Sequence, residues 1–242
     1  MLPTPVPLDD QTRARLAEVS TATLTTQLRK RGVVSVFIKG VAPLDPAGGR
    51  VVGPAFTLRH IPAREDITRP ELRAHPDYAQ RRAIEEAPPG HVLVMDCRGK
   101  RGAGMAGDIL VRRLIARGVA GLVADGPMRD AAAIAKLDLP VFCAGAAAPQ
   151  SMTLHHAIAV GEPIACGEVA VLPGDVIVGD GDGVVVVPSD LAAEVAAEAI
   201  EQERFERFVF ERVAAGHSIA GLYPPDADTI ADYARWCAKR DG

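Results

Sequence analysis

The stretch from Gly99 to Asp130 constrains the fold more than any other part of this chain. It opens with glycines, continues as an amphipathic helix with an apolar side made of Ile109, Leu110, Leu114 and Ile115, and reaches a short apolar strand at 121–124. A turn with Arg129 and Asp130 follows. A glycine-rich turn that leads into a helix directs backbone N–H groups and the positive end of the helix dipole at one place, which suits an anion. The sequence therefore predicts an α/β unit with an anion site, and the Asp130 carboxylate is a candidate metal ligand.

The composition is that of a folded protein. Of its 242 residues 48% are hydrophobic and only 4% aromatic, so Val, Ile, Leu and Ala must form the core. The net charge is −4 and the basic residues are scattered, which argues against nucleic acid as a partner. Four cysteines without CxxC spacing indicate reduced thiols. With no signal-peptide pattern and no apolar run of transmembrane length, we expect a soluble, cytoplasmic protein that does not bind membranes.

Strands that alternate with helices in the middle of the chain, with β-rich segments around them, predict a layered α/β fold. Asp9 or Asp10 and then Ser20 are candidate helix caps. We expect strands at 50–58, 91–96, 139–142 and 184–187, a long charged surface loop at 59–76, and helices at 77–87, 131–136, 190–215 and 226–239, the third of them capped by Ser189 and Asp190.

Gly102, Gly104 and Gly107 form a GxGxxG pattern that follows a strand and precedes a helix, and Asp125 lies where a ribose-binding acid would. An NAD(P)-binding oxidoreductase is therefore one hypothesis. Residues 97–101 separate the glycines from the strand, however, whereas a dinucleotide-binding turn follows its strand at once. The rest of the sequence also lacks further βα repeats, so we rank this interpretation below the one given next.

Each candidate residue also has an ordinary structural interpretation. Asp108 suits a helix cap, and Arg129 with Asp130 suits a surface turn. The acids Asp175, Asp180 and Asp182 lack the glycine and glutamate of a calcium loop, and we interpret them as turn residues. His155 and His156 are adjacent and cannot both face one metal ion from a regular strand, so we expect them to be structural.

Four ordered motifs carry a resemblance to a known family. They are VVGPAFTLR at 51–59, GDILVRRLIARGVAGLVADGPMRD at 107–130, LPVFCAG at 139–145 and PGDVIVGDGDGVVVVP at 173–188. Together they resemble the class II 4-hydroxy-4-methyl-2-oxoglutarate aldolases, a superfamily that also contains the regulator of ribonuclease activity A and proteins once labelled as menaquinone methyltransferases. The resemblance covers residues 20–215, which leaves 1–19 as a lead-in and helix and 216–242 as a helical extension.

The resemblance implies a swivelling β/β/α-type fold and a trimer or dimer of trimers with sites between subunits. It implies a pyruvate-binding loop formed by Gly107, Asp108, Ile109 and Leu110, with Arg129 as a substrate ligand and Asp130 as the ligand of Mg²⁺ or Mn²⁺. Both assignments agree with the chemistry of the residues. A helix start and an arginine fork hold carboxylates, and one carboxylate plus waters is a usual magnesium site.

The expected activity is that of a lyase that cleaves a 4-hydroxy-2-oxo acid to pyruvate and a second carbonyl compound, with oxaloacetate decarboxylation on the side. Asp108 is the candidate base, and the resemblance implies a glutamate from an adjacent chain. Among Glu201, Glu203 and Glu206 we rank Glu203 first. The charged segment at 59–82 departs from the short regulator-type members and leaves the substrate open, a sugar-acid-derived 2-oxo acid included. The alternative is a non-catalytic protein that binds and regulates a ribonuclease.

Overall fold

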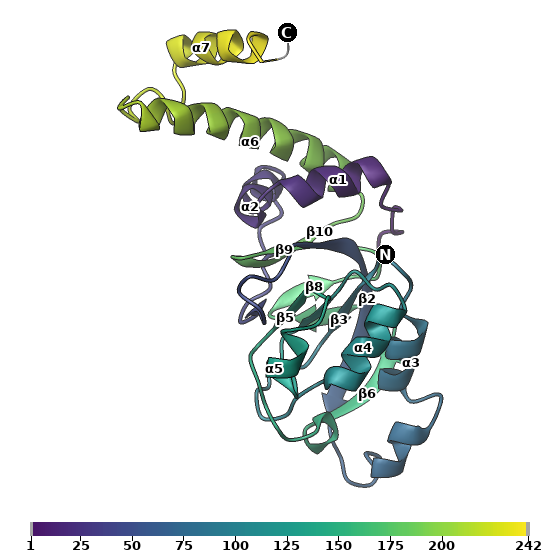
Figure 1. Ribbon diagram of the computed structural model, residues 1–242. Helices are drawn as coiled ribbons and strands as arrows, with labels where there is room; N and C mark the ends of the chain where they lie inside the picture. The colour runs from purple at the N-terminus through teal and green to yellow at the C-terminus, as the bar shows by residue number, and fades with distance from the viewer. Residues whose placement is uncertain (1, 241–242) are drawn as a thin grey trace.

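A computed structural model describes residues 2–240 of the chain (Figure 1). Its helices are α1 (Asp10–Glu18), α2 (Thr21–Lys30), η1 (Pro70–Ala74), α3 (Ala79–Glu86), α4 (Asp108–Ala116), α5 (Ala131–Ile134), η2 (Ser151–Thr153), α6 (Ala192–Ala214) and α7 (Ala227–Ala238). Its strands are β1 (Ala42–Pro43), β2 (Val51–Pro62), β3 (Val92–Met95), β4 (Gly121–Ala124), β5 (Val141–Cys143), β6 (His155–Val160), β7 (Ile164–Cys166), β8 (Val169–Val171), β9 (Val176–Asp180) and β10 (Gly183–Val187).

One mixed sheet organises the fold, with strand order β1-β5-β4-β3-β2-β9-β10. Strands β2 to β5 run parallel, whereas β9 and β10 pair antiparallel with β2 and with each other. The two end strands, β1 and β10, also contact each other, so the sheet almost closes into a barrel. The chain is thus a mixed α/β domain with a barrel-like sheet and helices at both ends.

The barrel is filled by apolar side chains that alternate along its strands. Val92, Val94 and Val123 point inward and meet Phe142 and Ile177. The β7–β8 hairpin closes this interior with Ile164, Cys166, Val169 and Val171. The core therefore consists almost entirely of aliphatic residues, as the low aromatic content requires.

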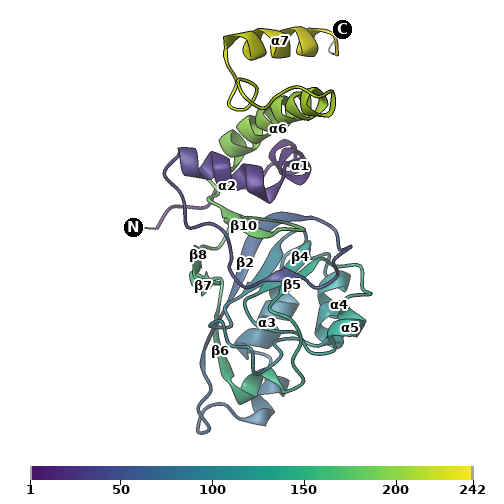
Figure 2. The same cartoon turned by 90° about the vertical axis from the view of Figure 1, so that its left-hand side faces the viewer.

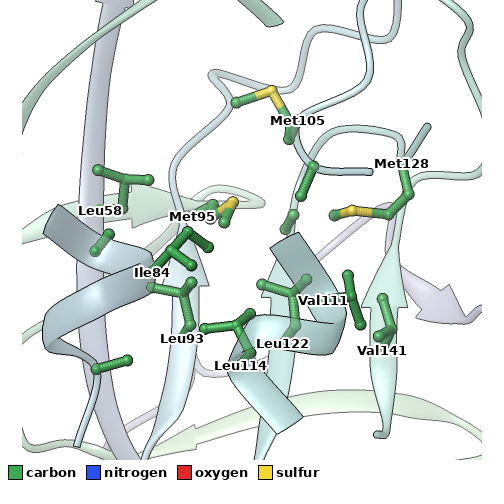
Figure 3. Close-up of a cluster of buried hydrophobic side chains, with 14 of the residues drawn as sticks. Leu58, Ile84, Leu93, Met95, Met105, Val111, Leu114, Leu122, Met128 and Val141 are labelled. Atoms are coloured by element: carbon green, nitrogen blue, oxygen red, sulfur yellow. The ribbon is translucent and has the colours of Figure 1, made fainter. Parts of the chain in front are cut away.

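Helices α3 and α4 cover the outer face of the parallel strands (Figure 1). Ile84 of α3 and Leu114 of α4 pack on Leu93 and Leu122 of the sheet (Figure 3). All four side chains are at most 2% exposed, so truncating Leu114 to alanine would cost about 2–5 kcal/mol of stability. This packing fixes the start of α4 relative to the ends of β3 and β4.

Helices α1 and α2 and the first turns of α6 pack on the outer face of β9 and β10. Asp9 and Ser20 cap α1 and α2 through their side chains, which confirms both predicted caps. Helix α6 lies across α1 and α2 and then projects from the body, and α7 folds back along its far end (Figures 1 and 2). No helix in the described range 2–240 is long and apolar enough to cross a membrane.

Two predictions of local structure were wrong. Residues 59–62 continue β2 instead of starting a loop, because they pair with β6 across a bulge at Arg59 and His60, and η1 interrupts the remainder of the charged segment. Ser189 and Asp190 do not cap α6, which starts at Ala192 after Leu191. The Ser189 hydroxyl instead accepts a hydrogen bond from the Val6 N–H at 3.0 Å.

Candidate functional site

The candidate site lies where the parallel strands β3, β4 and β5 end, since loops from neighbouring parallel strands meet at the same edge of a sheet. Backbone hydrogen bonds join the three loops. The Met105 N–H donates to the Pro127 carbonyl at 2.8 Å, and the Arg129 N–H donates to the Ala106 carbonyl at 2.9 Å. The Met128 N–H donates to the Gly145 carbonyl at 2.9 Å. These bonds hold the glycine-rich segment and the Arg129–Asp130 turn side by side.

Two of the glycines are explained by this close approach. A Cβ at Gly104 would lie 2.7 Å from the Arg129 nitrogen and 2.6 Å from the Ala147 oxygen, both of them backbone atoms. A Cβ at Gly107 would lie 2.8 Å from Oδ2 of Asp130. Only glycine fits at Gly104 without moving the backbone, and at Gly107 the missing side chain leaves room for the Asp130 carboxylate.

Helix α4 starts with open backbone donors. Gly107 is its N-cap and has no side chain to satisfy the first turn, so the interpretation of Asp108 as the capping residue was wrong. The N–H groups of Leu110 and Val111 donate to the Gly107 carbonyl, at 3.1 and 3.2 Å. Within residues 2–240, the N–H groups of Asp108 and Ile109 have no acceptor. The first turn therefore offers two free donors beside the Asp130 carboxylate, an arrangement that binds a carboxylate or phosphate.

The side chains of this turn are polar at the site and apolar beside it. Asp108 is about one-third exposed, and Nε of Arg112, one helical turn later, lies 3.8 Å from its Oδ2. Ile109 is 76% exposed, which is unusual for an isoleucine on a helix that packs on a core.

Arg129 and Asp130 lie at the same edge of the sheet, next to the start of α4. Arg129 is half-buried, and its stem lies over Gly104. Asp130 is exposed and has a left-handed backbone with φ 53°, which is uncommon for residues other than glycine and marks functional turns. In the part of the chain that the structure describes, neither the guanidinium nor the carboxylate has a hydrogen-bond or ion-pair partner.

The donor set fits a hard divalent ion bound through few protein ligands. No group of three or more metal-ligating side chains occurs among the described residues, which excludes a protein-only zinc or calcium cage there. Asp130 is an unpaired exposed carboxylate with space beside it at Gly107. Mg²⁺ keeps most of its waters and requires only one or two carboxylates, so the residues present suit it.

Asp125 is not available to a ribose. Its carboxylate accepts hydrogen bonds from the backbone N–H groups of Cys97 at 2.5 Å, Gly99 at 2.9 Å and Gly167 at 3.2 Å, and the residue is 6% exposed. It therefore fixes the loop after β3, and Gly104 of the GxGxxG pattern packs against protein backbone. Both findings count against a dinucleotide site.

The other acids of interest also fix turns. Asp175 accepts from the Leu172 N–H at 2.8 Å, and Asp180 accepts from the Asp182 N–H at 3.0 Å, both within their turns. Asp180 also accepts from the N–H and hydroxyl of Thr21, both at 2.8 Å, and so joins its turn to α2. The interpretation of these acids as turn residues is supported by these bonds.

A buried histidine pair beside the same edge was not predicted as a unit. His60 of β2 and His155 of β6 are 3% and 1% exposed, and their rings stack edge to face with centroids 5.7 Å apart. His60 Nδ1 lies 2.8 Å from the Asp96 carbonyl, which can only accept, so Nδ1 carries the proton. Burial, with smaller effects from His155 and Arg98, lowers the pKa of His60 to about 3 although the Asp96 bond opposes it. Burial and Arg98 lower the pKa of His155 to about 4.

Glu203 lies away from these residues in the single chain. It belongs to α6, and its carboxylate accepts from the Ser20 N–H at 3.0 Å, the Ser20 hydroxyl at 2.9 Å and the Thr23 hydroxyl at 2.7 Å. Burial raises its pKa, but these hydrogen bonds outweigh burial and lower the pKa overall. The structure thus joins Asp108, Arg129 and Asp130 but not Glu203.

Comparison with known proteins identifies the family to which the chain belongs. Residues 19–186 match the model of the RraA-like proteins, described as Aldolase/RraA, and the chain belongs to that family. The resemblance drawn from the sequence motifs is thereby confirmed.

Individual relatives agree with this assignment. The chain is 34% identical over 181 residues to a Halalkalibacterium halodurans protein named "Putative 4-hydroxy-4-methyl-2-oxoglutarate aldolase", covering 72% of this chain and 79% of that one. It is 37% identical to the crystal structure of Streptomyces coelicolor RraAS2, described as an unusual member of the RNase ES inhibitor RraA protein family, with a TM-score of 0.74 over 85% of this chain and 98% of that one. An uncharacterized protein from Pseudomonas syringae matches with 28% identity and a TM-score of 0.78 over 90% of this chain and 99% of that one.

Proposed function

We propose that this chain is a divalent-metal-dependent pyruvate aldolase, a lyase that cleaves a 4-hydroxy-2-oxo acid and decarboxylates oxaloacetate as a side activity. The observation that carries the proposal is the meeting of the open α4 start with the unpaired Arg129 and Asp130 at one edge of the sheet. The kinship with a protein named as an aldolase supports the same reaction class.

In the proposed complex the α4 start and Arg129 bind the 2-oxo acid. The N–H groups of Asp108 and Ile109 donate to one carboxylate oxygen, and the Arg129 fork donates to the other. The C3–C4 bond of the substrate is thereby held at a fixed distance from the side chains of the same turn. This positioning lowers the entropic part of the activation barrier for cleavage.

Asp130 would hold the divalent ion, Mg²⁺ or Mn²⁺, with water and substrate oxygens as the remaining ligands. When bound, the ion supplies Lewis-acid polarisation of the 2-oxo group. The Asp130 carboxylate lies beside Gly107, and it is therefore next to the substrate-binding turn.

Asp108 is assigned as the general base. Its carboxylate takes the proton of the C4 hydroxyl, the O–H electron pair forms the C4 carbonyl, and the C3–C4 pair passes to C3 as the bond breaks. The proton that Asp108 has taken up is then delivered to C3, which gives pyruvate and restores the carboxylate. Loss of CO₂ from oxaloacetate leaves the same electron pair on C3, so both reactions use one site.

The proposal includes the assembly implied by the family: a swivelling β/β/α-type subunit in a trimer or a dimer of trimers, with Glu203 reaching the site of a neighbouring subunit. In the single chain Ser20 and Thr23 orient the Glu203 carboxylate. In this assignment Glu203 is a positioning residue that acts through water on Asp108.

The test is pyruvate release from a panel of 4-hydroxy-2-oxo acids and from oxaloacetate, with Mg²⁺, with Mn²⁺ and after chelation. Asp130→Ala should lose metal-dependent turnover and retain its melting temperature, since the carboxylate has no partner to lose within residues 2–240. The proposal fails if this variant retains metal-dependent turnover, or if wild type releases no pyruvate from any substrate.

A second candidate is a regulator that binds a ribonuclease, and the similarity to RraAS2 favours it. The two candidates separate in one experiment. If the chain is an aldolase, wild type and Asp130→Ala should differ in pyruvate release. If both proteins inhibit an RNase E-type endoribonuclease to the same extent, the chain is a regulator that acts through a surface outside the site.

A further inference from the structure

Helices α3 and α4 lie side by side (Figure 1). Residues of both helices line a groove next to the candidate site. Its volume is about 430 Å³, enough for a group of several heavy atoms. The apolar part of its lining is formed by Ile84, Ile109 and Leu110. None of the proposed chemical steps uses this groove.

The groove is continuous with the substrate-binding turn. Ile109 and Leu110 belong to the first turn of α4, the turn whose free N–H groups are assigned to the substrate carboxylate. Gln80 of α3, also in the lining, donates to the Met105 carbonyl at 2.6 Å and so fixes the groove wall to the glycine-rich segment. The groove therefore shares residues with the turn to which the substrate carboxylate is assigned.

The polar part of the groove carries positive charge. Arg113 is compensated by Glu85, which lies 2.7 Å from its Nη2. Neither Arg81 nor Arg73 forms a salt bridge in the described chain, although the charge of Arg81 also acts on Glu85. Arg81 donates to the Arg73 carbonyl at 2.9 Å, and Arg73 donates to the Gln150 amide oxygen at 2.6 Å and to the Pro70 carbonyl at 3.3 Å. These bonds leave four of the five guanidinium protons of Arg81 and three of the five of Arg73 for an anion.

We infer, on the basis of the proposed function, that this groove binds the part of the substrate beyond C4, and that the enzyme prefers 4-hydroxy-2-oxo acids with an apolar chain at C4 that ends in a carboxylate. The apolar chain covers the exposed Ile109 side chain, and the terminal carboxylate pairs with Arg81 and Arg73. The charged segment that contains Arg73 thereby acquires a role in specificity.

The experiment compares two substrates with the same apolar chain at C4, one ending in a carboxylate and one in a methyl group, with oxaloacetate as a third substrate that has nothing beyond C4. Wild type should prefer the carboxylate-ended substrate about tenfold or more in kcat/KM, the scale of one charged hydrogen bond. Arg81→Gln should remove most of that preference, with an unchanged ratio of kcat/KM for the methyl-ended substrate to that for oxaloacetate.

Arg82→Gln is the matched control, because Arg82 is the next residue of α3, pairs with Glu86 at 2.7 Å and does not line the groove. It should retain the wild-type preference. The inference is overturned if wild type turns over oxaloacetate but shows no preference between the two long substrates, or if Arg82→Gln removes the preference as fully as Arg81→Gln.

Two further outcomes are distinguishable. If no substrate, oxaloacetate included, releases pyruvate, then the proposed function itself fails and the inference fails with it. If Arg81→Gln changes the mass of the assembly by light scattering, the groove is occupied by a second copy of this chain and not by substrate.

Discussion

Replacing His60 by asparagine should remove a large part of the pH dependence of stability. In the folded protein burial lowers the pKa of His60 to about 3, against 6.5 for an exposed histidine. Between these values the unfolded chain binds a proton that the folded chain does not, so stability is lost as the pH falls through this window. An asparagine amide retains an N–H for the Asp96 carbonyl and does not titrate.

The magnitude follows from the two pKa values. At pH 5 the unfolded histidine is almost fully protonated and the folded one almost fully neutral. From pH 7.5 to pH 5 this costs about 2 kcal/mol, roughly 1.36 kcal/mol for each of about one and a half effective pH units. A folded pKa one unit higher would change this figure little, since pH 5 still lies above it.

The assay is urea unfolding at four pH values from 7.5 to 5.0, followed by circular dichroism. Wild type should lose about 2 kcal/mol more than His60→Asn over this range. The smaller side chain adds a constant cost at every pH, so the difference in slope is the informative quantity. His217→Asn, at an exposed position, controls for loss of an imidazole. If the two stability curves of wild type and His60→Asn stay parallel within about 0.5 kcal/mol, His60 protonates freely in the folded state and the reasoning is refuted.

Three other predictions concern the site. Arg129→Lys should reduce kcat/KM about 10- to 100-fold, because an ammonium cannot replace a bidentate fork; near-normal kinetics would exclude the bidentate contact. Gly107→Ala should displace the Asp130 carboxylate, 2.8 Å from the new Cβ, and reduce turnover by up to about 100-fold while the melting temperature changes little; wild-type kinetics would contradict this. Glu203→Gln should lower the unfolding free energy by about 1 kcal/mol, because a carboxylate that accepts from three donors is lost. The same variant should reduce turnover about 10- to 100-fold. Mixing it with Asp130→Ala after reversible dissociation should restore part of the activity, whereas full activity of Glu203→Gln alone would leave Glu203 only its structural bonds.

The sequence predicts best where periodicity and local chemistry agree. The strand at 121–124 has the predicted bounds, and the helix that begins at Asp108 follows the predicted glycines. Local signals also place Arg129 and Asp130 directly after a buried strand. Because parallel strands end at one edge, these residues meet the helix start as expected.

Prediction failed where distant partners determine the conformation. Arg59 and His60 are polar and precede a proline-rich segment, yet they form a strand because β6, almost a hundred residues later, pairs with them. The same pairing buries His60 beside His155, a contact that no local pattern shows. The groove was likewise invisible in the sequence, since it depends on how α3 packs beside α4.

The twelve-residue strand β2 also has a consequence for how this protein is made. It pairs with β9, whose residues follow it by more than 120 positions, and with β6, more than 90 positions later. While a ribosome synthesises the chain, β3 can pair with one edge of β2 early, but the edge that pairs with β6 and β9 stays unpaired until residues beyond 176 emerge, and an unpaired edge of this kind invites aggregation. Contacts between such distant residues also slow folding. A chain terminated shortly after residue 150 would contain every residue of the Arg129–Asp130 site and still lack β6 and β9, the strands that pair with the second edge of β2.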